Sequence, residues 1–196
     1  MEYMGDSAWW NRRFESRDWK LMSHEICLEQ DIHYFSGKKR ILDVACGDGR
    51  NAIYLARMGY HVTCVDFSEE ALKRLDYFAR EESLAITTKM ADLSEELNFP
   101  QTERYDAIVI NHYRLNPKLY PKLMSFLGEE GILWVNGFRE VPADNPDITE
   151  EDILKDDDFR TIDSYTLKDK NAYEVGQRKF VRYIWRSDCG RGFIAK

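Results

Sequence analysis

A short glycine-rich segment and a carboxylate that follows it are the residues best suited to chemistry. The segment is Gly47-x-Gly49-x-x-Ala52, and Asp66 lies 19 residues after Gly47. Glycines at this spacing let a ligand approach the backbone closely, and an acid at this distance accepts hydrogen bonds from ribose hydroxyls. The spacing predicts a nucleotide-like cofactor, and it fits a nicotinamide dinucleotide as well as any other adenosine-containing molecule.

Asp43 separates these possibilities. We expect its carboxylate near the end of a strand, beside the glycine segment and facing the ligand. A pyrophosphate gains nothing from that charge, whereas S-adenosylmethionine carries an ammonium and a sulfonium group. Burying Asp43 without a partner would cost on the order of several kcal/mol. The alternative interpretation is that Asp43 only caps the amides of its own loop.

Alternating strands and helices are predicted to position these residues. Strands are expected at 40–45, 61–65, 84–90, 105–111 and 131–136, and helices at 51–58, 69–82 and 117–126, the last ended by Gly128. Apolar strands separated by helices are typical of parallel β-α-β units, whose ligands bind beyond the carboxyl ends of the strands. Two further strands, at 161–166 and 179–185, predict an antiparallel pair at the sheet edge, joined by a polar connection containing Gly176.

The predicted fold is α/β, with a doubly wound, mostly parallel seven-stranded sheet and an antiparallel edge strand. Apolar and aromatic residues at helical spacing predict one or two helices in residues 7–36, ending near Gly37. Residues 1–37 are therefore interpreted as a helical extension or lid, and residues 38–196 as the cofactor-binding part of one structural domain.

Composition narrows the class of function. The chain has 196 residues and a net charge of −7, which argues against a dedicated nucleic-acid binder and favours a small-molecule substrate. No apolar run approaches the roughly 20 residues that span a bilayer, so no membrane partner is expected. The segment 140–163 holds ten acids and two bases and is interpreted as solvated surface.

The cysteines predict a reducing compartment. They lie at positions 27, 46, 64 and 189 without a C-x-x-C pair. His61 and Cys64 are three residues apart on a predicted strand, so their side chains point to opposite faces. We therefore expect a cytoplasmic protein without a metal, either a monomer or a homodimer.

Two runs carry a family resemblance. They are Ile-Leu-Asp-Val-Ala-Cys-Gly-Asp-Gly-Arg-Asn at 41–51 and Gly-Tyr-His-Val-Thr-Cys-Val-Asp-Phe-Ser at 59–68. Together they resemble class I S-adenosylmethionine-dependent methyltransferases, which have a Rossmann-like fold, and within them the small bacterial tellurite-resistance-type enzymes. Ala45 departs from the first glycine of the family pattern E/D-x-G-x-G-x-G, and we expect its methyl group to narrow the loop.

The resemblance implies a set of cofactor contacts. Asp43 would lie near the ammonium, Asp66 would hold the ribose hydroxyls, Phe67 would pack on the adenine and Asn111 would lie beside the methyl group. The remaining implied contacts are Ala45, Cys46, Gly47 and Gly49 around the methionine part, and Asp92 and Leu93 at the adenine edge.

The methyl acceptor is open at this point. A thiol, metalloid oxyanion, amine or carboxylate would fit, and an amine or hydroxyl would need a base, for which His112 is the candidate. Tyr113 and Arg114 are predicted to line the substrate pocket, with Arg114 suited to an anion. No Asn-Pro-Pro-Tyr follows the fourth predicted strand, so the signature of enzymes that methylate DNA bases is absent.

Other interpretations remain. Trp9 and Trp10 would lie in a helix over the cofactor, or would simply anchor the extension to the other helices. The alternatives to a methyltransferase are a protein that binds the same cofactor without turnover and, less favoured, an NAD-dependent oxidoreductase.

Overall fold

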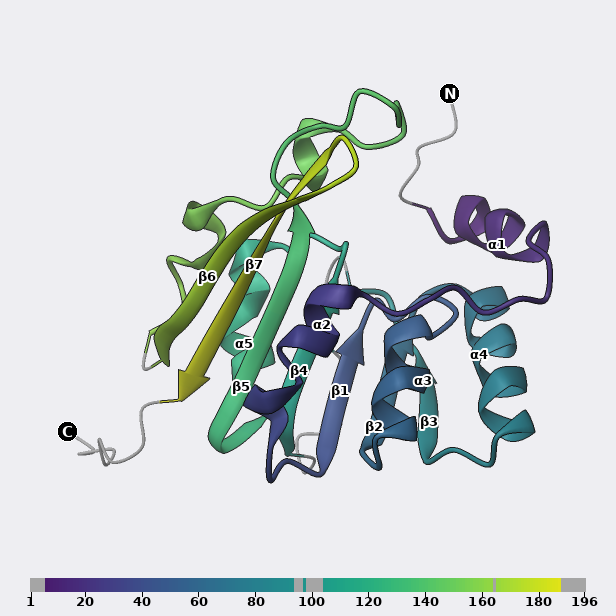
Figure 1. Ribbon diagram of the computed structural model, residues 1–196, viewed down its shortest axis with the longest axis horizontal. Coiled ribbons are helices and arrows are strands. Elements are labelled where there is room, and N and C mark those ends of the chain that lie inside the picture. The colour runs from purple at the N-terminus through teal and green to yellow at the C-terminus, as the bar shows by residue number, and fades with distance from the viewer. Residues whose placement is uncertain (1–5, 94–96, 98–103, 164, 188–196) are drawn as a thin grey trace.

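A single seven-stranded sheet organises the molecule. The computed structural model describes residues 6–93, 97, 104–163 and 165–187. The strand order is β3-β2-β1-β4-β5-β7-β6 (Figure 1). Strands β1 to β5 are parallel, and β7 runs antiparallel to both of its neighbours. The strands are β1 (Arg40–Val44), β2 (His61–Asp66), β3 (Ile86–Met90), β4 (Tyr105–Asn111), β5 (Leu127–Phe138), β6 (Tyr165–Val175) and β7 (Arg178–Ser187).

Helices cover both faces of the sheet. The α-helices are α1 (Ser7–Glu15), α2 (Ile26–Gln30), α3 (Arg50–Arg57), α4 (Glu69–Glu81) and α5 (Tyr120–Met124), and the 3-10 helices are η1 (Ile32–Phe35), η2 (Pro117–Leu119), η3 (Glu150–Asp152) and η4 (Asp156–Phe159). Helices α2, α3 and α4 pack on one face and α5 and η4 on the other. Successive strand residues serve opposite cores, as Ile41 and Leu42 do, because side chains alternate across a strand.

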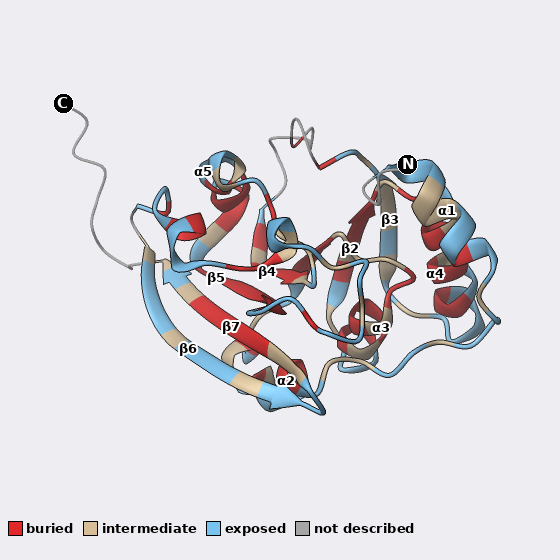
Figure 2. Cartoon of the chain, turned by 90° about the horizontal axis from the view of Figure 1, so that it is seen from above, coloured by how far each residue is buried: buried red, intermediate tan, exposed pale blue. Residues whose placement is uncertain are grey.

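The predicted fold class is confirmed, and the β6–β7 hairpin corrects its details. β6 begins at Tyr165 rather than at 161, and it continues to Val175 through what was expected to be a connection. Most of its side chains are exposed (Figure 2), so the apolar signal of a strand is weak there. Gly176, with φ +63°, lies at the turn itself. Gly128 also differs from expectation because it lies inside β5 and does not end a helix.

The N-terminal segment forms two short α-helices and a 3-10 helix, with irregular chain at 16–25 between α1 and α2. Helix α1 lies against the start of α4 (Figure 1), where Asn11 Oδ1 accepts hydrogen bonds from Ser68 Oγ at 2.7 Å and from the Glu70 amide at 3.3 Å. Phe14 is the buried residue of α1. Within the described ranges, no helix combines the length and hydropathy needed to cross a membrane.

Candidate active site

The glycine segment forms a tight loop between β1 and α3. Gly47 and Gly49 have φ of +56° and +83°, in the left-handed region that glycine adopts without a steric penalty. Ala45 also has positive φ, +55°, so the departure from the family pattern places an alanine where glycine is usually found. The Cys46 amide donates to the Val65 carbonyl at 3.1 Å, which joins the loop to the end of β2.

Asp43 is a buried carboxylate, and one of its oxygens lacks a hydrogen-bond partner among the described residues. Its side chain is 2% exposed, and the oxygen without a partner is Oδ2. Burial, together with the negative charge of Asp66, raises the pKa of Asp43 to about 7, although Arg50 opposes the rise. A buried oxygen without a partner is costly, so this position is suited to a cationic or hydrogen-bond-donating ligand.

Asp66 ends β2 and is held by the loop. Its Oδ2 accepts from the Gly47 amide at 2.8 Å and its Oδ1 from the Ser68 amide at 2.9 Å. Burial raises the pKa of Asp66, and these amides oppose the rise. Ser68 also caps α4, as expected, because its side chain accepts from the Ala71 amide. The two acids at the ends of β1 and β2 therefore share one site.

The three residues predicted to contact the adenine differ in how far they are buried. Phe67 is half-buried, Asp92 is exposed, and the Leu93 side chain is buried in the core at 5% exposure. Burial, with the charges of Asp92 and Asp66, raises the pKa of Tyr113 to about 12. Tyr113, from the segment after β4, therefore faces the same acidic edge as these carboxylates.

Asn111 is fixed by a chain of hydrogen bonds. Its Oδ1 accepts from Asn136 Nδ2 at 3.0 Å, and the Tyr173 hydroxyl donates to Asn136 Oδ1 at 2.9 Å. The same hydroxyl lies 3.1 Å from the sulfur of Cys27. Asn136 is completely buried at the register position beside Asn111. The chain links the end of β4 to the β6–β7 hairpin and to α2.

His112 follows β4 in a conformation that side chains rarely adopt, with φ +54°. Its ring is stacked on Phe180, with a 5.2 Å centroid distance and a 9° interplanar angle, and its Nε2 lies 3.3 Å from Glu25 Oε1. The same Glu25 oxygen forms an ion pair with Arg50. Burial lowers the pKa of His112; Glu25 opposes this, and Arg50 and Arg178 add to it. A neutral imidazole at neutral pH follows.

Arg114 lies beside these residues but is engaged by the protein itself. Its Nε and one terminal nitrogen donate to the two carboxylate oxygens of Asp158 at 2.9 and 2.6 Å. The other terminal nitrogen donates to the Glu151 carbonyl at 3.0 Å. The arrangement favours a role in holding the segment after β5 against the end of β4, rather than the anion-binding role expected from sequence.

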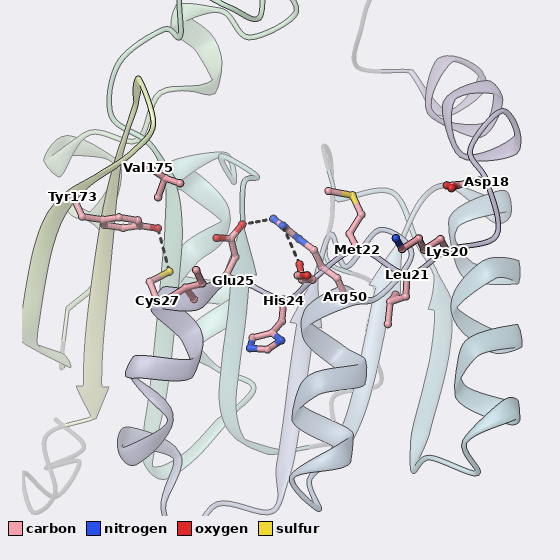
Figure 3. Close-up of a pocket in the computed structure, with 12 residues that line it drawn as sticks. Asp18, Lys20, Leu21, Met22, His24, Glu25, Cys27, Arg50, Tyr173 and Val175 are labelled. Atoms are coloured by element: carbon pink, nitrogen blue, oxygen red, sulfur yellow. Dashed lines mark hydrogen bonds and ion pairs between the residues drawn. The ribbon is translucent and has the colours of Figure 1, made fainter.

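A pocket of about 520 Å³ lies between the N-terminal segment, the start of α3 and β6. Asp18 and residues 20–27 form one side of it, and Arg50, Tyr173 and Val175 complete the lining (Figure 3). Glu25 both lines this pocket and contacts His112. The described residues therefore provide a cofactor-like loop and a neighbouring cavity at the same edge of the sheet.

Comparison with known proteins agrees with this geometry. Residues 41–129 match the model of a methyltransferase domain. The crystal structure of TehB from Haemophilus influenzae superposes with a TM-score of 0.68 and 20% identity, covering 93% of this chain and 67% of that one. The fold is that of the S-adenosylmethionine-dependent methyltransferases. The predicted resemblance to the tellurite-resistance-type members is also confirmed.

The relatives of this methyltransferase fold differ in length and chemistry. The probable S-adenosyl-L-methionine-dependent methyltransferase TehB of H. influenzae strain 10810 is 39% identical over 70 residues, which are 36% of this chain and 23% of TehB. The chain matches only 23% to 56% of the length of its curated relatives. The [4+2]-cyclase SpnF has a TM-score of 0.64 at 16% identity, covering 89% of this chain and 86% of that one.

Three site residues of this methyltransferase fold were missed by sequence reasoning. Glu25 and Tyr173 lie far from the glycine loop in sequence, and no local pattern marks them. Asn136 carried a usable signal, because it is a polar residue at the end of the fifth predicted strand. Glu25 and Tyr173 reach the site only through the packing of α2 and the β6–β7 hairpin against the sheet, whereas Asn136 lies there because β5 pairs with β4.

Proposed function

We propose that the protein binds S-adenosylmethionine at the carboxyl edge of its sheet and transfers the methyl group to a small molecule. The observation that carries this proposal is the buried Oδ2 of Asp43, which has no hydrogen-bond partner among the described residues. It lies beside the loop in which Gly47 and Gly49 have positive φ. The ammonium group of the cofactor would supply the missing partner. When bound, S-adenosylmethionine supplies a methyl group on a positively charged sulfur, which departs as a neutral thioether.

The chain's own residues would bind and align. Asp43, Ala45, Cys46, Gly47 and Gly49 would surround the methionine part. Asp66 would accept from the ribose hydroxyls, because each of its oxygens has accepting capacity beyond the amide bond that it already receives. The residues proposed for the other end of the cofactor are Phe67, Asp92, Leu93 and Asn111. Alignment supplies much of the rate of such a displacement, since the leaving group is already activated.

At the site of the methyl acceptor, His112 would take the proton and Tyr113 would line the substrate pocket. His112 is suited to this role because loss of solvation around its ring lowers its pKa and favours the neutral imidazole. The acidic net charge favours a small molecule over nucleic acid as the acceptor. Cys27, Cys46 and Cys64 are free thiols, which favours the cytoplasm as the compartment.

Calorimetric titration with S-adenosylhomocysteine tests the cofactor assignment. We expect micromolar binding, at least tenfold weaker binding in Asp66→Ala, and no binding of NAD. Binding of NAD in place of S-adenosylhomocysteine by a folded sample would refute the assignment.

A second candidate is a protein that keeps the cofactor without methyl transfer. The likeness to the [4+2]-cyclase SpnF favours keeping this alternative, because that protein shares the fold. Formation of S-adenosylhomocysteine from S-adenosylmethionine with a panel of thiols, amines, oxyanions and carboxylates separates the two functions.

A further inference from the structure

The guanidinium group of Arg74 is a buried charge that has no part in the contacts proposed above for the cofactor. Arg74 lies in the second turn of α4 and is 3% exposed. Its Nε donates to Asp48 Oδ2 at 3.3 Å. Its two terminal nitrogens donate to main-chain carbonyls, that of Arg17 at 3.3 Å and that of Asp18 at 2.7 Å. One side chain therefore joins the glycine loop to the chain that follows α1.

Asp48 is the residue of the glycine loop that receives this charge. It lies between Gly47 and Gly49 and is itself buried, at 4% exposure. Burying a carboxylate is costly unless an opposite charge and hydrogen bonds compensate for the loss of water. Arg74 supplies both, and Arg17 Nη1 lies 3.7 Å from the same oxygen. The loop is thus tied to α4 through an ion pair that is almost entirely buried.

The glycine loop needs contacts from outside to keep one conformation. Glycine has more backbone freedom than other residues, so fixing it costs more entropy. On one side β2 holds the loop, because the Asp66 carboxylate accepts from the Gly47 amide. On the other side Leu75 of α4 packs closely on Gly49, and Phe14 of α1 lies against the loop as well. A loop that is held in its binding conformation beforehand costs less to organise when a ligand binds.

The chain between α1 and α2, which we call the crossing segment (residues 16–25), is fixed at both ends. It passes over the ends of α4 and α3 (Figure 1) and lines much of the pocket in Figure 3. Arg74 holds its first part through the two carbonyl groups. The start of α3 holds its last residue, Glu25, through an ion pair with Arg50 and a hydrogen bond to Asn51. Because Arg74 bonds the loop and this segment together, it sets their relative position.

We propose that Arg74 is a positioning residue for cofactor binding, which fixes the glycine loop and the crossing segment in the arrangement that receives the methionine part of S-adenosylmethionine. The proposal rests on the function proposed above. Arg74 acts through Asp48 and touches no atom of the cofactor itself. Such coupling is reciprocal, so the bound cofactor must in turn stabilise the crossing segment.

Calorimetric titration of Arg74→Met with two ligands tests the effect on the loop. S-adenosylhomocysteine has the amino-acid part that the loop would surround, whereas methylthioadenosine lacks it. We expect binding of S-adenosylhomocysteine to weaken by about tenfold, the equivalent of one hydrogen bond to a charged group, and binding of methylthioadenosine by less than about twofold. Arg80→Met removes an exposed arginine from the same helix and should change neither. Equal losses for both ligands, or none for either, would overturn the proposal.

Limited digestion with trypsin reports on the crossing segment, which contains cleavage sites after Arg17 and Lys20. In ligand-free Arg74→Met we expect cleavage there to be about tenfold faster than in wild type, because the rate follows the population of the open segment. S-adenosylhomocysteine should slow this cleavage. Cleavage at the wild-type rate in a folded Arg74→Met sample would contradict the role of Arg74 in holding the segment.

Asp48→Ala separates the two links of Arg74, and it remains informative if Arg74→Met does not fold. It removes the partner in the loop but keeps the hydrogen bonds from Arg74 to the crossing segment. We therefore expect the same loss of affinity for S-adenosylhomocysteine, with trypsin cleavage at the wild-type rate. Undiminished affinity in Asp48→Ala would overturn the link to the loop. A wild type that does not bind S-adenosylhomocysteine refutes the proposed function, whereas the trypsin rates of the ligand-free variants still test how Arg74 holds the segment.

Discussion

Replacing Asp43 with asparagine should stabilise the protein increasingly as pH rises. The pKa of this carboxyl rises from 3.8 to about 7 on folding, which corresponds to about 4 kcal/mol. The folded state therefore binds more protons than the unfolded state between these values. Stability is greatest below pH 3.8 and is lost as pH rises toward 7, because the ionised carboxylate is disfavoured in the fold.

The magnitude can be worked out for two accessible conditions. With these pKa values, Asp43 destabilises the wild type by about 2 kcal/mol at pH 5 and about 4 kcal/mol at pH 8. The asparagine amide is also buried, but its contribution is independent of pH. The stability difference between Asp43→Asn and wild type should therefore shift by about 2–3 kcal/mol in favour of the variant between pH 5 and pH 8.

Urea unfolding at both pH values measures this difference. Asp163→Asn, at an exposed position, is the matched control and should show no such shift. Calorimetry adds an independent readout, because a ligand cation at Asp43 would lower its pKa and release about half a proton per ligand at pH 7. We expect Asp43→Asn to bind S-adenosylhomocysteine at least tenfold more weakly and to release no proton. A stability difference that stays constant with pH, or wild-type affinity in the variant, would refute this account of Asp43.

Two further substitutions test how the site is built. Gly49→Ala should destabilise by about 3 kcal/mol in urea unfolding, because a Cβ there would lie 2.2 Å from Leu75 Cδ1. Gly37→Ala shares the positive φ but meets open space, so a loss of about 1 kcal/mol is expected, and equal losses in both variants would contradict the packing argument. Arg114→Met should lose about 2–4 kcal/mol by the same assay, because it leaves the Asp158 carboxylate buried without its partner. Adding Asp158→Leu should recover part of that loss, and simple additivity of the two changes would argue against the ion pair.

The cofactor half of the site could be predicted because its information is local. The glycine loop and Asp66 lie within one β-α-β unit, so their spacing along the chain fixes their arrangement in space. The predicted boundaries of β4 also agree with the structure, and the apolar run 107–110 marks the centre of that strand.

The extent of β6 in the β6–β7 hairpin could not be predicted from its local sequence. The side chains of β6 are mostly exposed on an edge, so its sequence resembles a polar connection. Its placement depends on pairing with β7, which contributes the information that β6 itself lacks. Tyr173 therefore could not be predicted as a site residue without the position of the hairpin.

Arg114 and His112 differ in a way that sequence could not reveal. Both follow β4, and both looked available for a substrate. Asp158 comes from an acidic segment that was interpreted as solvated surface, yet it is 2% exposed and neutralises Arg114. Loss of solvation lowers the pKa of His112, and Glu25, which also pairs with Arg50, opposes this only in part, so the imidazole stays neutral. The outcome for each residue depends on the charge that the rest of the fold brings to it, and that charge makes His112 the better candidate to receive a proton.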